Sequence, residues 1–94
     1  MRDLDPTIHQ PARLRILMIL SGVDSADFTF LQQPLGLSKG NLSTHMTRLE
    51  EKGYVQVTKS FRGKMPHTSY QLTKRGRSSL RTYWEAIDAI RGDG

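Results

Sequence analysis

The part of the sequence that most limits the possible folds is Leu37–Val55, which reads LSKGNLSTHMTRLEEKGYV. Its apolar residues recur at intervals of four and three, which is the spacing of one stripe along an α-helix. Ser38 is suited to cap the N-terminus of such a helix, and Gly53 stands where a glycine commonly follows the last turn. We therefore predict a helix over Leu37–Lys52. Its buried stripe is expected to consist of Leu42, Met46 and Leu49.

The periodicity changes directly after this helix. Tyr54–Lys59 alternates between apolar and polar residues and contains β-branched side chains, which is typical of a strand. Phe61–Pro66 is predicted to form a turn, and His67–Leu72 a second strand. The segment 54–72 is therefore predicted to be a β-hairpin with a basic tip.

Further helices are predicted on both sides of this region. Asp5–Leu20 has helical spacing, with Pro11 able to restart the helix within it. Asp24–Asp27 offers capping residues for a shorter second helix that begins with the apolar residues Phe28, Leu31 and Leu35. Pro34 should end or distort this helix, because the residue before a proline disfavours helical angles. Thr73 can cap a last helix that reaches nearly to the end of the sequence.

The order of these elements is helix, helix, helix, hairpin, helix. This order predicts an α+β fold that is mostly α, a winged helix-turn-helix with three helices, a two-stranded β-hairpin wing and a C-terminal helix. Residues 1–94 are expected to form one domain with a modest core. Within it, the helix-turn-helix is expected at 27–53, the wing at 54–72 and the last helix at 73–91.

Charge is distributed unevenly along the chain. Residues 1–35 carry three basic and four acidic side chains, a net charge of −1, whereas residues 36–77 carry nine basic and two acidic side chains, a net charge of +7. A basic excess gathered in one segment is expected of a protein that binds nucleic acid. A solvated basic surface that only keeps the protein soluble is the alternative.

The helix over Leu37–Lys52 carries a second face opposite its apolar stripe. Short hydroxyl side chains and a glycine allow a close approach to a duplex, and Arg48 can reach guanine or phosphate. A plain solvent-exposed helix is the alternative, but serine, threonine and glycine are poor choices for helix stability alone. The DNA-binding residues predicted on this helix are Ser38, Lys39, Gly40, Asn41, Ser43, Thr44, Thr47 and Arg48.

The predicted wing carries a second set of candidate DNA-binding residues. Basic side chains flank a glycine at the hairpin tip, a shape suited to contacts with phosphates or a minor groove. A charged loop that serves solubility is the alternative. The residues predicted here are Lys59, Arg62, Gly63 and Lys64.

Several of these motifs together carry a resemblance to a known group of proteins. They are the run Leu35–Ser43, His45, Leu49–Glu51, Gly53–Val55, and Leu72–Thr73 with Gly76. The chain resembles small winged-helix transcriptional regulators related to the MarR and ArsR families that consist of little more than the DNA-binding domain. The resemblance implies a homodimer on a pseudo-palindromic operator of double-stranded DNA, with the third helix in the major groove. Pro34 departs from the pattern, because such proteins usually continue their second helix there.

The last helix is the candidate for dimerisation. Its large apolar residues form a stripe at helical spacing, which could either meet a partner subunit or pack on the chain's own core. The resemblance implies that Leu4, Ile8 and the first helix also help to form the interface. The residues expected at the dimer interface are Leu4, Ile8, Leu80, Tyr83, Trp84, Ile87 and Ile90.

Other classes of protein are disfavoured by what the sequence contains. The chain has no cysteine and three scattered histidines, so we expect no catalytic residues, no metal ligands, no cofactor and no enzymatic activity. A histidine-carboxylate metal site formed across a dimer is left open. No apolar run is long enough for a membrane span, and the N-terminus does not look like a signal peptide, so we expect a cytoplasmic protein. A winged helix that docks on proteins and a non-specific nucleic-acid binder remain the alternative functions, and no residue identifies an effector.

Overall fold

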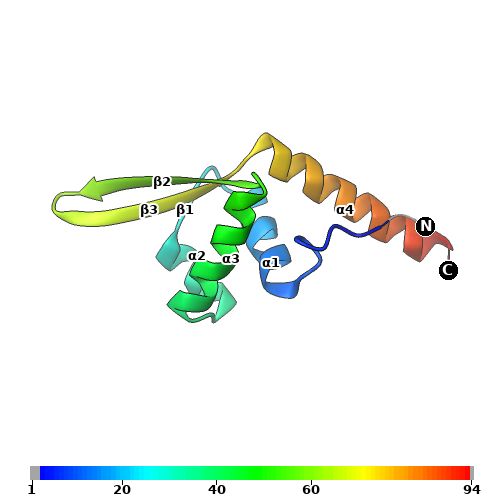
Figure 1. The fold of residues 1–94 in the computed structure, drawn as a ribbon, viewed down its shortest axis with the longest axis horizontal. Helices are drawn as coiled ribbons and strands as arrows, with labels where there is room; N and C mark the ends of the chain where they lie inside the picture. The colour runs from blue at the N-terminus through cyan, green and yellow to red at the C-terminus, as the bar shows by residue number, and fades with distance from the viewer. Residues whose placement is uncertain (1–2, 94) are drawn as a thin grey trace.

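Helices and strands follow one another in the predicted order in a computed structural model that describes residues 3–93 (Figure 1). The predicted domain range of 1–94 therefore includes residues 1, 2 and 94, which lie outside the described residues. The predicted α+β winged helix is confirmed, with one strand more than expected. The elements are α1 Pro11–Ser21, β1 Ala26–Asp27, α2 Phe28–Leu35, α3 Lys39–Glu51, β2 Val55–Arg62, β3 Met65–Leu72 and α4 Lys74–Asp93.

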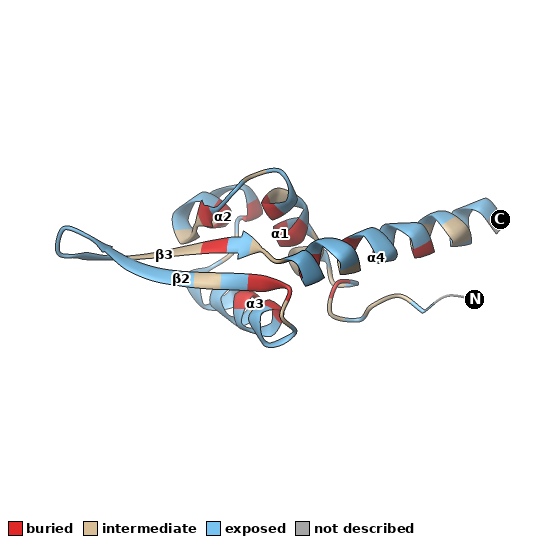
Figure 2. Cartoon of the chain, turned by 90° about the horizontal axis from the view of Figure 1, so that it is seen from above, coloured by how far each residue is buried: buried red, intermediate tan, exposed pale blue. Residues whose placement is uncertain are grey.

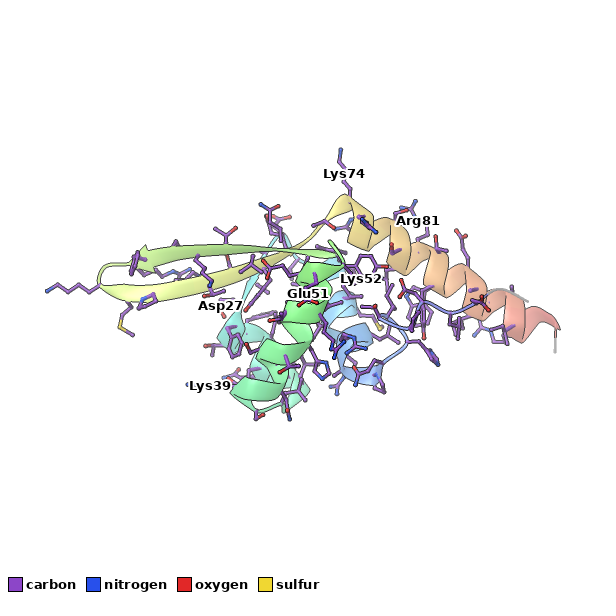
Figure 3. The ribbon with its side chains drawn as sticks, in the orientation of Figure 1. Asp27, Lys39, Glu51, Lys52, Lys74 and Arg81 are labelled. Atoms are coloured by element: carbon purple, nitrogen blue, oxygen red, sulfur yellow. The ribbon has the colours of Figure 1, made fainter. Side chains whose placement is uncertain are left out.

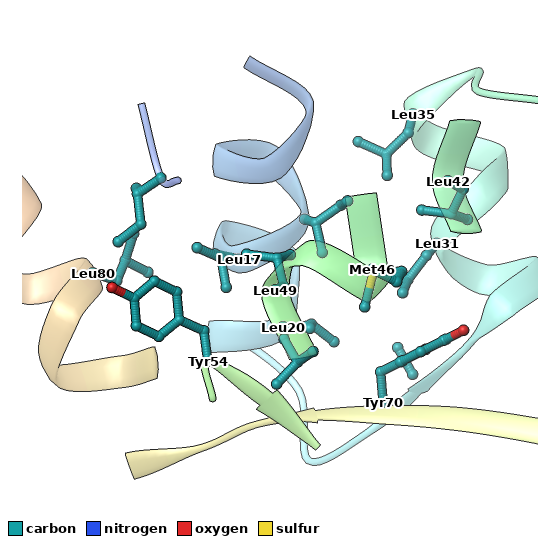
Figure 4. Packing of buried hydrophobic residues seen from close by; sticks show 14 of the residues in the cluster. Leu17, Leu20, Leu31, Leu35, Leu42, Met46, Leu49, Tyr54, Tyr70 and Leu80 are labelled. Carbon is teal, nitrogen blue, oxygen red and sulfur yellow. The ribbon is translucent and has the colours of Figure 1, made fainter. Parts of the chain in front are cut away.

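The core lies where α1, α2 and α3 meet the base of the sheet (Figure 4). Leu42, Met46 and Leu49 of α3 are all buried, so the apolar stripe predicted for this helix is confirmed. Tyr54 and Tyr70 cover the core from the sheet side. The remaining large side chains that are fully buried are Ile8, Ile16, Leu17, Leu20 and Leu31.

Helix α1 begins later than the sequence indicated. The Asp5 carboxylate accepts a hydrogen bond from the backbone N–H of Thr7 at 2.9 Å, and this closes a turn instead of starting a helix. The helix begins at Pro11, the residue that was expected to restart it, and the Gln10 side chain caps it by accepting from the N–H of Arg13 at 2.8 Å. Asp5 also accepts a hydrogen bond from the Tyr54 hydroxyl, which ties the N-terminal segment to the connection between α3 and β2.

Helix α2 passes through its proline. The Asp27 carboxylate accepts from the N–H of Phe30 at 2.7 Å and caps the helix, which then continues to Leu35. Pro34, which was expected to end or distort the helix, lies inside it, one residue before its last residue. A proline this close to the C-terminus removes only one intrahelical hydrogen bond, and its carbonyl oxygen accepts from the Arg15 side chain at 3.0 Å.

The sheet has the strand order β1-β3-β2 and is antiparallel throughout. Strand β1 was missed because two residues are too short to show alternation. The turn of the hairpin is also shorter than the predicted Phe61–Pro66, because the strands pair as far as Arg62 with Met65. Gly63 has a positive φ of 64°, which lets the chain reverse within two residues. The wing is hereafter the ribbon of β2, β3 and this turn.

Helix α4 starts with the predicted cap and leaves the body of the protein along its length (Figures 1 and 2). The Thr73 hydroxyl accepts from the N–H of Gly76 at 2.9 Å and donates to the carbonyl of Gly53 at 2.6 Å. The first half of α4 packs beside the N-terminal segment, where His9 Nδ1 lies 2.9 Å from the Tyr83 hydroxyl. Within residues 3–93, no helix is long and apolar enough to cross a lipid bilayer.

Candidate nucleic-acid interface

One face of α3 is free because the other is held in the core. Since Leu42 and Leu49 have no exposed surface, the helix cannot rotate, and its opposite side is fixed toward solvent. Figure 3 shows α3 in front of the other helices, with Lys39 at its lower end and Glu51 at its upper end. We call the exposed side the polar face of α3. It consists of Gly40, Ser43, Thr44, Thr47 and Arg48.

The N-terminus of α3 is built as a donor site. The Ser38 hydroxyl accepts from the N–H of Asn41 at 3.1 Å, so this side chain caps the helix as predicted. The first N–H groups of an α-helix have no intrahelical acceptor, and they carry the positive end of the helix dipole. Lys39 and Asn41 are exposed beside them. This end of the helix is therefore suited to a phosphate oxygen.

The polar face offers hydroxyl, methyl and guanidinium groups to a ligand. The Thr44 hydroxyl donates to the carbonyl of Gly40 at 2.9 Å, which leaves its methyl group and its oxygen lone pair for a ligand. A methyl group suits the methyl of thymine, and a hydroxyl oxygen suits an amino donor. Ser43, Thr47 and Arg48 border the same shallow hollow. Glu51 borders the same hollow at its C-terminal end. The part of the polar face from Gly40 to Thr47 can therefore contact base edges without an acidic side chain.

A basic cluster on the α1 side of α3 was not anticipated from the sequence. Arg13 Nε donates to the carbonyl of Thr7 at 2.6 Å, and Arg13 Nη1 lies 3.3 Å from His45 Nδ1. Desolvation, followed by repulsion from Arg48, lowers the pKa of Arg13. Arg13, Arg48 and Lys52 line one hollow beside the polar face. Residues 1–35 have a net negative charge, so no sequence signal marked Arg13 as part of this surface.

His45 makes folding stability depend on pH. Burial and then the nearby Arg13 and Arg48 hold the pKa of His45 below its ordinary value of 6.5. The unfolded chain therefore binds a proton at a higher pH than the folded protein does, and stability is lost as pH falls below about 6.5 toward the lower pKa of the folded protein. We expect His45→Gln and Arg13→Gln each to reduce this loss in urea unfolding curves recorded between about pH 5 and pH 7.5. An undiminished pH dependence in both variants would contradict this origin.

The wing carries its predicted cations on different sides. Lys59 pairs with Thr68 and Arg62 pairs with Met65, and side chains alternate between the two faces of a ribbon. Lys59 and Thr68 line a hollow with Ser43 and Thr47 of α3, so the face that holds Lys59 is the one directed at α3. Arg62 lies on the opposite face and Lys64 in the turn. The wing cations therefore surround the ribbon and do not form one patch.

The residues expected at a dimer interface divide into two groups. Ile8, Leu80 and Tyr83 are buried within the single chain and expose little surface to a partner, so their place at a dimer interface stays a prediction. Their stripe packs on the chain's own core, which periodicity alone could not distinguish from a partner. A second group of apolar side chains stays accessible beside the N-terminal segment and on the outer half of α4. It consists of Leu4 and Ile87, both half-buried, and of Trp84 and Ile90, which are 38% and 44% exposed.

The fold and this surface define a DNA-binding winged helix, and comparison with known proteins agrees. Residues 12–90 match the family described as the winged helix DNA-binding domain. The chain therefore belongs to that family. An uncharacterized protein of Methanocaldococcus jannaschii is 35% identical over 71 residues, which are 76% of this chain and 77% of that protein.

Solved structures place the fold among transcriptional regulators. The transcriptional regulator homologue of Pyrococcus horikoshii OT3 aligns with a TM-score of 0.85 and 28% identity, over 93% of this chain and 86% of that one. A MarR-family transcriptional regulator of Silicibacter pomeroyi has the same fold, with a TM-score of 0.68 and 24% identity over 85% of this chain and 53% of that one. The predicted resemblance to small winged-helix regulators is confirmed.

Proposed function

We propose that this protein is a homodimeric transcriptional regulator that binds a pseudo-palindromic operator in double-stranded DNA. In this proposal α3 lies in the major groove and the wing lies on the backbone or in the minor groove. The observation that carries the proposal is the polar face of α3, which the buried stripe of the same helix holds toward solvent.

The dimensions and chemistry of α3 suit a major groove. The groove is about 12 Å wide, and an α-helix with its side chains has a diameter of about 10–12 Å, so small residues at the contact allow the helix to enter deeply. Gly40, Ser43 and Thr47 are small, and Arg48 can donate two hydrogen bonds to a guanine. The acids Glu50 and Glu51 stand only at the C-terminal end, where the helix would leave the groove.

The surroundings of α3 supply charge for the phosphates. Arg13 and Lys52 flank the polar face on the α1 side, and Lys59 flanks it on the wing side. Contacts of this kind hold a protein in register on the duplex but do not read its sequence. We therefore assign Arg13, Lys52 and the wing cations to phosphate, and the polar face of α3 to the bases.

The exposed part of α4 supports the proposed dimerisation. Trp84 is packed edge-on against Tyr83, with ring centroids 5.4 Å apart, and still exposes 38% of its surface. Tryptophan is enriched among the residues that dominate binding energy at interfaces. A two-fold dimer through Trp84, Ile87 and Ile90 would present two copies of α3 to half-sites about 34–36 Å apart.

Variants of α3 and of the wing should weaken DNA binding in different ways. Arg48→Ala is expected to cost about 1–3 kcal/mol of preference for the operator over random DNA, because a base contact is lost. The double variant Arg62→Ala/Lys64→Ala should weaken binding to all DNA similarly and make the salt dependence shallower by about two phosphate contacts. Fluorescence anisotropy titrations over a range of salt concentrations measure both quantities.

A matched control is available on the other side of the protein. Lys74 is exposed at the start of α4 and points away from the polar face of α3 (Figure 3), so Lys74→Ala removes one positive charge without removing a contact. It should change binding less than either set of variants does. If Arg48→Ala weakened operator and random DNA equally, the assignment of α3 to base reading would be wrong.

A further inference from the structure

The wing tip carries apolar side chains that the core does not use. Phe61 is 74% exposed and Met65 is 70% exposed, the largest exposures among the big apolar residues of the described chain. A projecting ribbon gains little stability from such residues, since each leaves most of its surface exposed in the folded chain. Their position next to the turn at Gly63 and Lys64 instead points to contact with a ligand of the wing.

We propose that Phe61, backed by Pro66, acts as an apolar wedge that inserts into the minor groove of bound DNA, partly unstacks one base step and kinks the duplex. The proposal rests on the proposed function, because it takes duplex DNA as the ligand of the wing. Phe61 is not among the DNA-binding residues predicted from the sequence. Its insertion would bend the DNA, which charge alone would not do.

The register of the hairpin fixes the direction of Phe61. Phe61 pairs with Pro66, Lys59 with Thr68, and Val57 with Tyr70. Paired residues and residues two apart share one face of a ribbon. The inner part of this face borders the hollow beside Ser43 and Thr47 of α3. Phe61 and Pro66 therefore lie on the face of the ribbon that is directed at α3, but closer to the tip. Met65 lies on the opposite face.

The reach of the wing suits a groove next to α3. Phe61 lies four residues beyond Val57, and at about 3.3 Å per residue this is roughly 13 Å along the ribbon. Figure 1 shows the hairpin extending well past the helices. A duplex seated on the polar face of α3 would thus meet the wing tip one groove away, and phenylalanine and proline are among the side chains that wedge between base steps from the minor groove.

The charge around the tip favours nucleic acid over other partners. Arg62 and Lys64 flank the tip, and Lys59 shares the face of Phe61. The sequence contains no acidic residue between Glu51 and Glu85, so the whole wing lacks negative charge. Cations that hold the backbone beside an inserted apolar side chain are the combination used by proteins that bend DNA through the minor groove.

The experiment measures bending directly. Energy transfer between dyes at the two ends of a duplex of about 30 base pairs reports a kink. One duplex comes from the gene's own upstream region and is studied at about 0.15 M salt, and the other has a random sequence and is studied at low salt, where basic proteins bind any DNA. The unmodified protein should bend the duplex it binds. Phe61→Ala should abolish most of the bend and weaken binding about tenfold.

Two further variants make the result specific to the wedge. Phe61→Leu should keep most of the bend, because leucine can also wedge, and Met65→Ala should keep it, because Met65 lies on the opposite face. An equal bend with and without the Phe61 ring, or no bend with the unmodified protein on either duplex, would overturn the wedge. Bending of random DNA without preference for the upstream duplex would support the wedge and contradict a sequence-specific regulator. Preference for the upstream duplex without a bend would support a sequence-specific regulator and overturn the wedge.

Discussion

Gly76→Ala is expected to lower the free energy of unfolding by about 3 kcal/mol or more, the upper end of the cost of overpacking. A Cβ at this position would lie 2.1 Å from the carbonyl oxygen of Tyr54 and 2.8 Å from Leu72 Cδ1. The leucine side chain can rotate, but the Tyr54 backbone is held by hydrogen bonds from the N–H of Thr73 at 3.1 Å and to the carbonyl of Leu49 at 2.9 Å. Helix α4 would have to move away from the sheet.

Urea unfolding followed by circular dichroism measures this loss. Gly92→Ala is the matched control, since it makes the same change in the same helix at a site where the added Cβ would meet no atom within 4 Å beyond its chain neighbours and the backbone of its own helix. This control should unfold at the same urea concentration as the parent or at a slightly higher one, because alanine favours a helix over glycine. A Gly76→Ala protein as stable as the parent would show that α4 does not pack as closely on Tyr54 as described.

The double variant Trp84→Glu/Ile90→Glu is expected to lose about 100-fold or more in affinity for a duplex with two half-sites. Both side chains are well exposed, so the substitutions should leave the chain folded while placing like charges in the dimer interface. Linking two half-site contacts commonly adds about 10²–10⁴-fold in affinity, and a monomer forfeits that gain. Sedimentation measures the oligomeric state, and anisotropy measures affinity for duplexes with one and two half-sites.

Binding to the single half-site should change little in this variant, which separates loss of dimerisation from loss of the DNA-binding surface. Phe30→Glu is the matched control, because Phe30 is also a large exposed apolar residue, 52% exposed, but lies on α2, outside the predicted interface. It should remain dimeric. If the Trp84/Ile90 variant stayed dimeric with full affinity, the interface would have to be sought on another surface.

The parts of the fold that depend on local rules could be predicted from the sequence. The stripe of Leu42, Met46 and Leu49 fixed which side of α3 is buried, and hence which side faces solvent. Ser38 and Thr73 cap their helices as their side-chain chemistry requires. The alternation after Gly53 marked the wing, because side chains on a half-buried strand must alternate.

The parts that depend on distant residues could not be predicted. Strand β1 exists only because Ala26 and Asp27 meet Tyr70 and Ser69 of β3, more than forty residues away in sequence. Arg13 and His45 are 32 positions apart in sequence and likewise lie side by side only because the fold brings them together. Periodicity marks an apolar stripe on α4 but does not say what covers it. Tyr83 faces the chain's own N-terminal segment, and Trp84 faces solvent.

Sequence-specific recognition of DNA by α3 can be tested in a single titration. A labelled duplex from the gene's own upstream region is titrated by fluorescence anisotropy at about 0.15 M salt, with and without an excess of unlabelled random DNA. We predict binding that survives the competitor, because base contacts from the polar face of α3 add to the phosphate contacts. Binding that disappears with the competitor, on several candidate upstream duplexes, would contradict sequence-specific recognition.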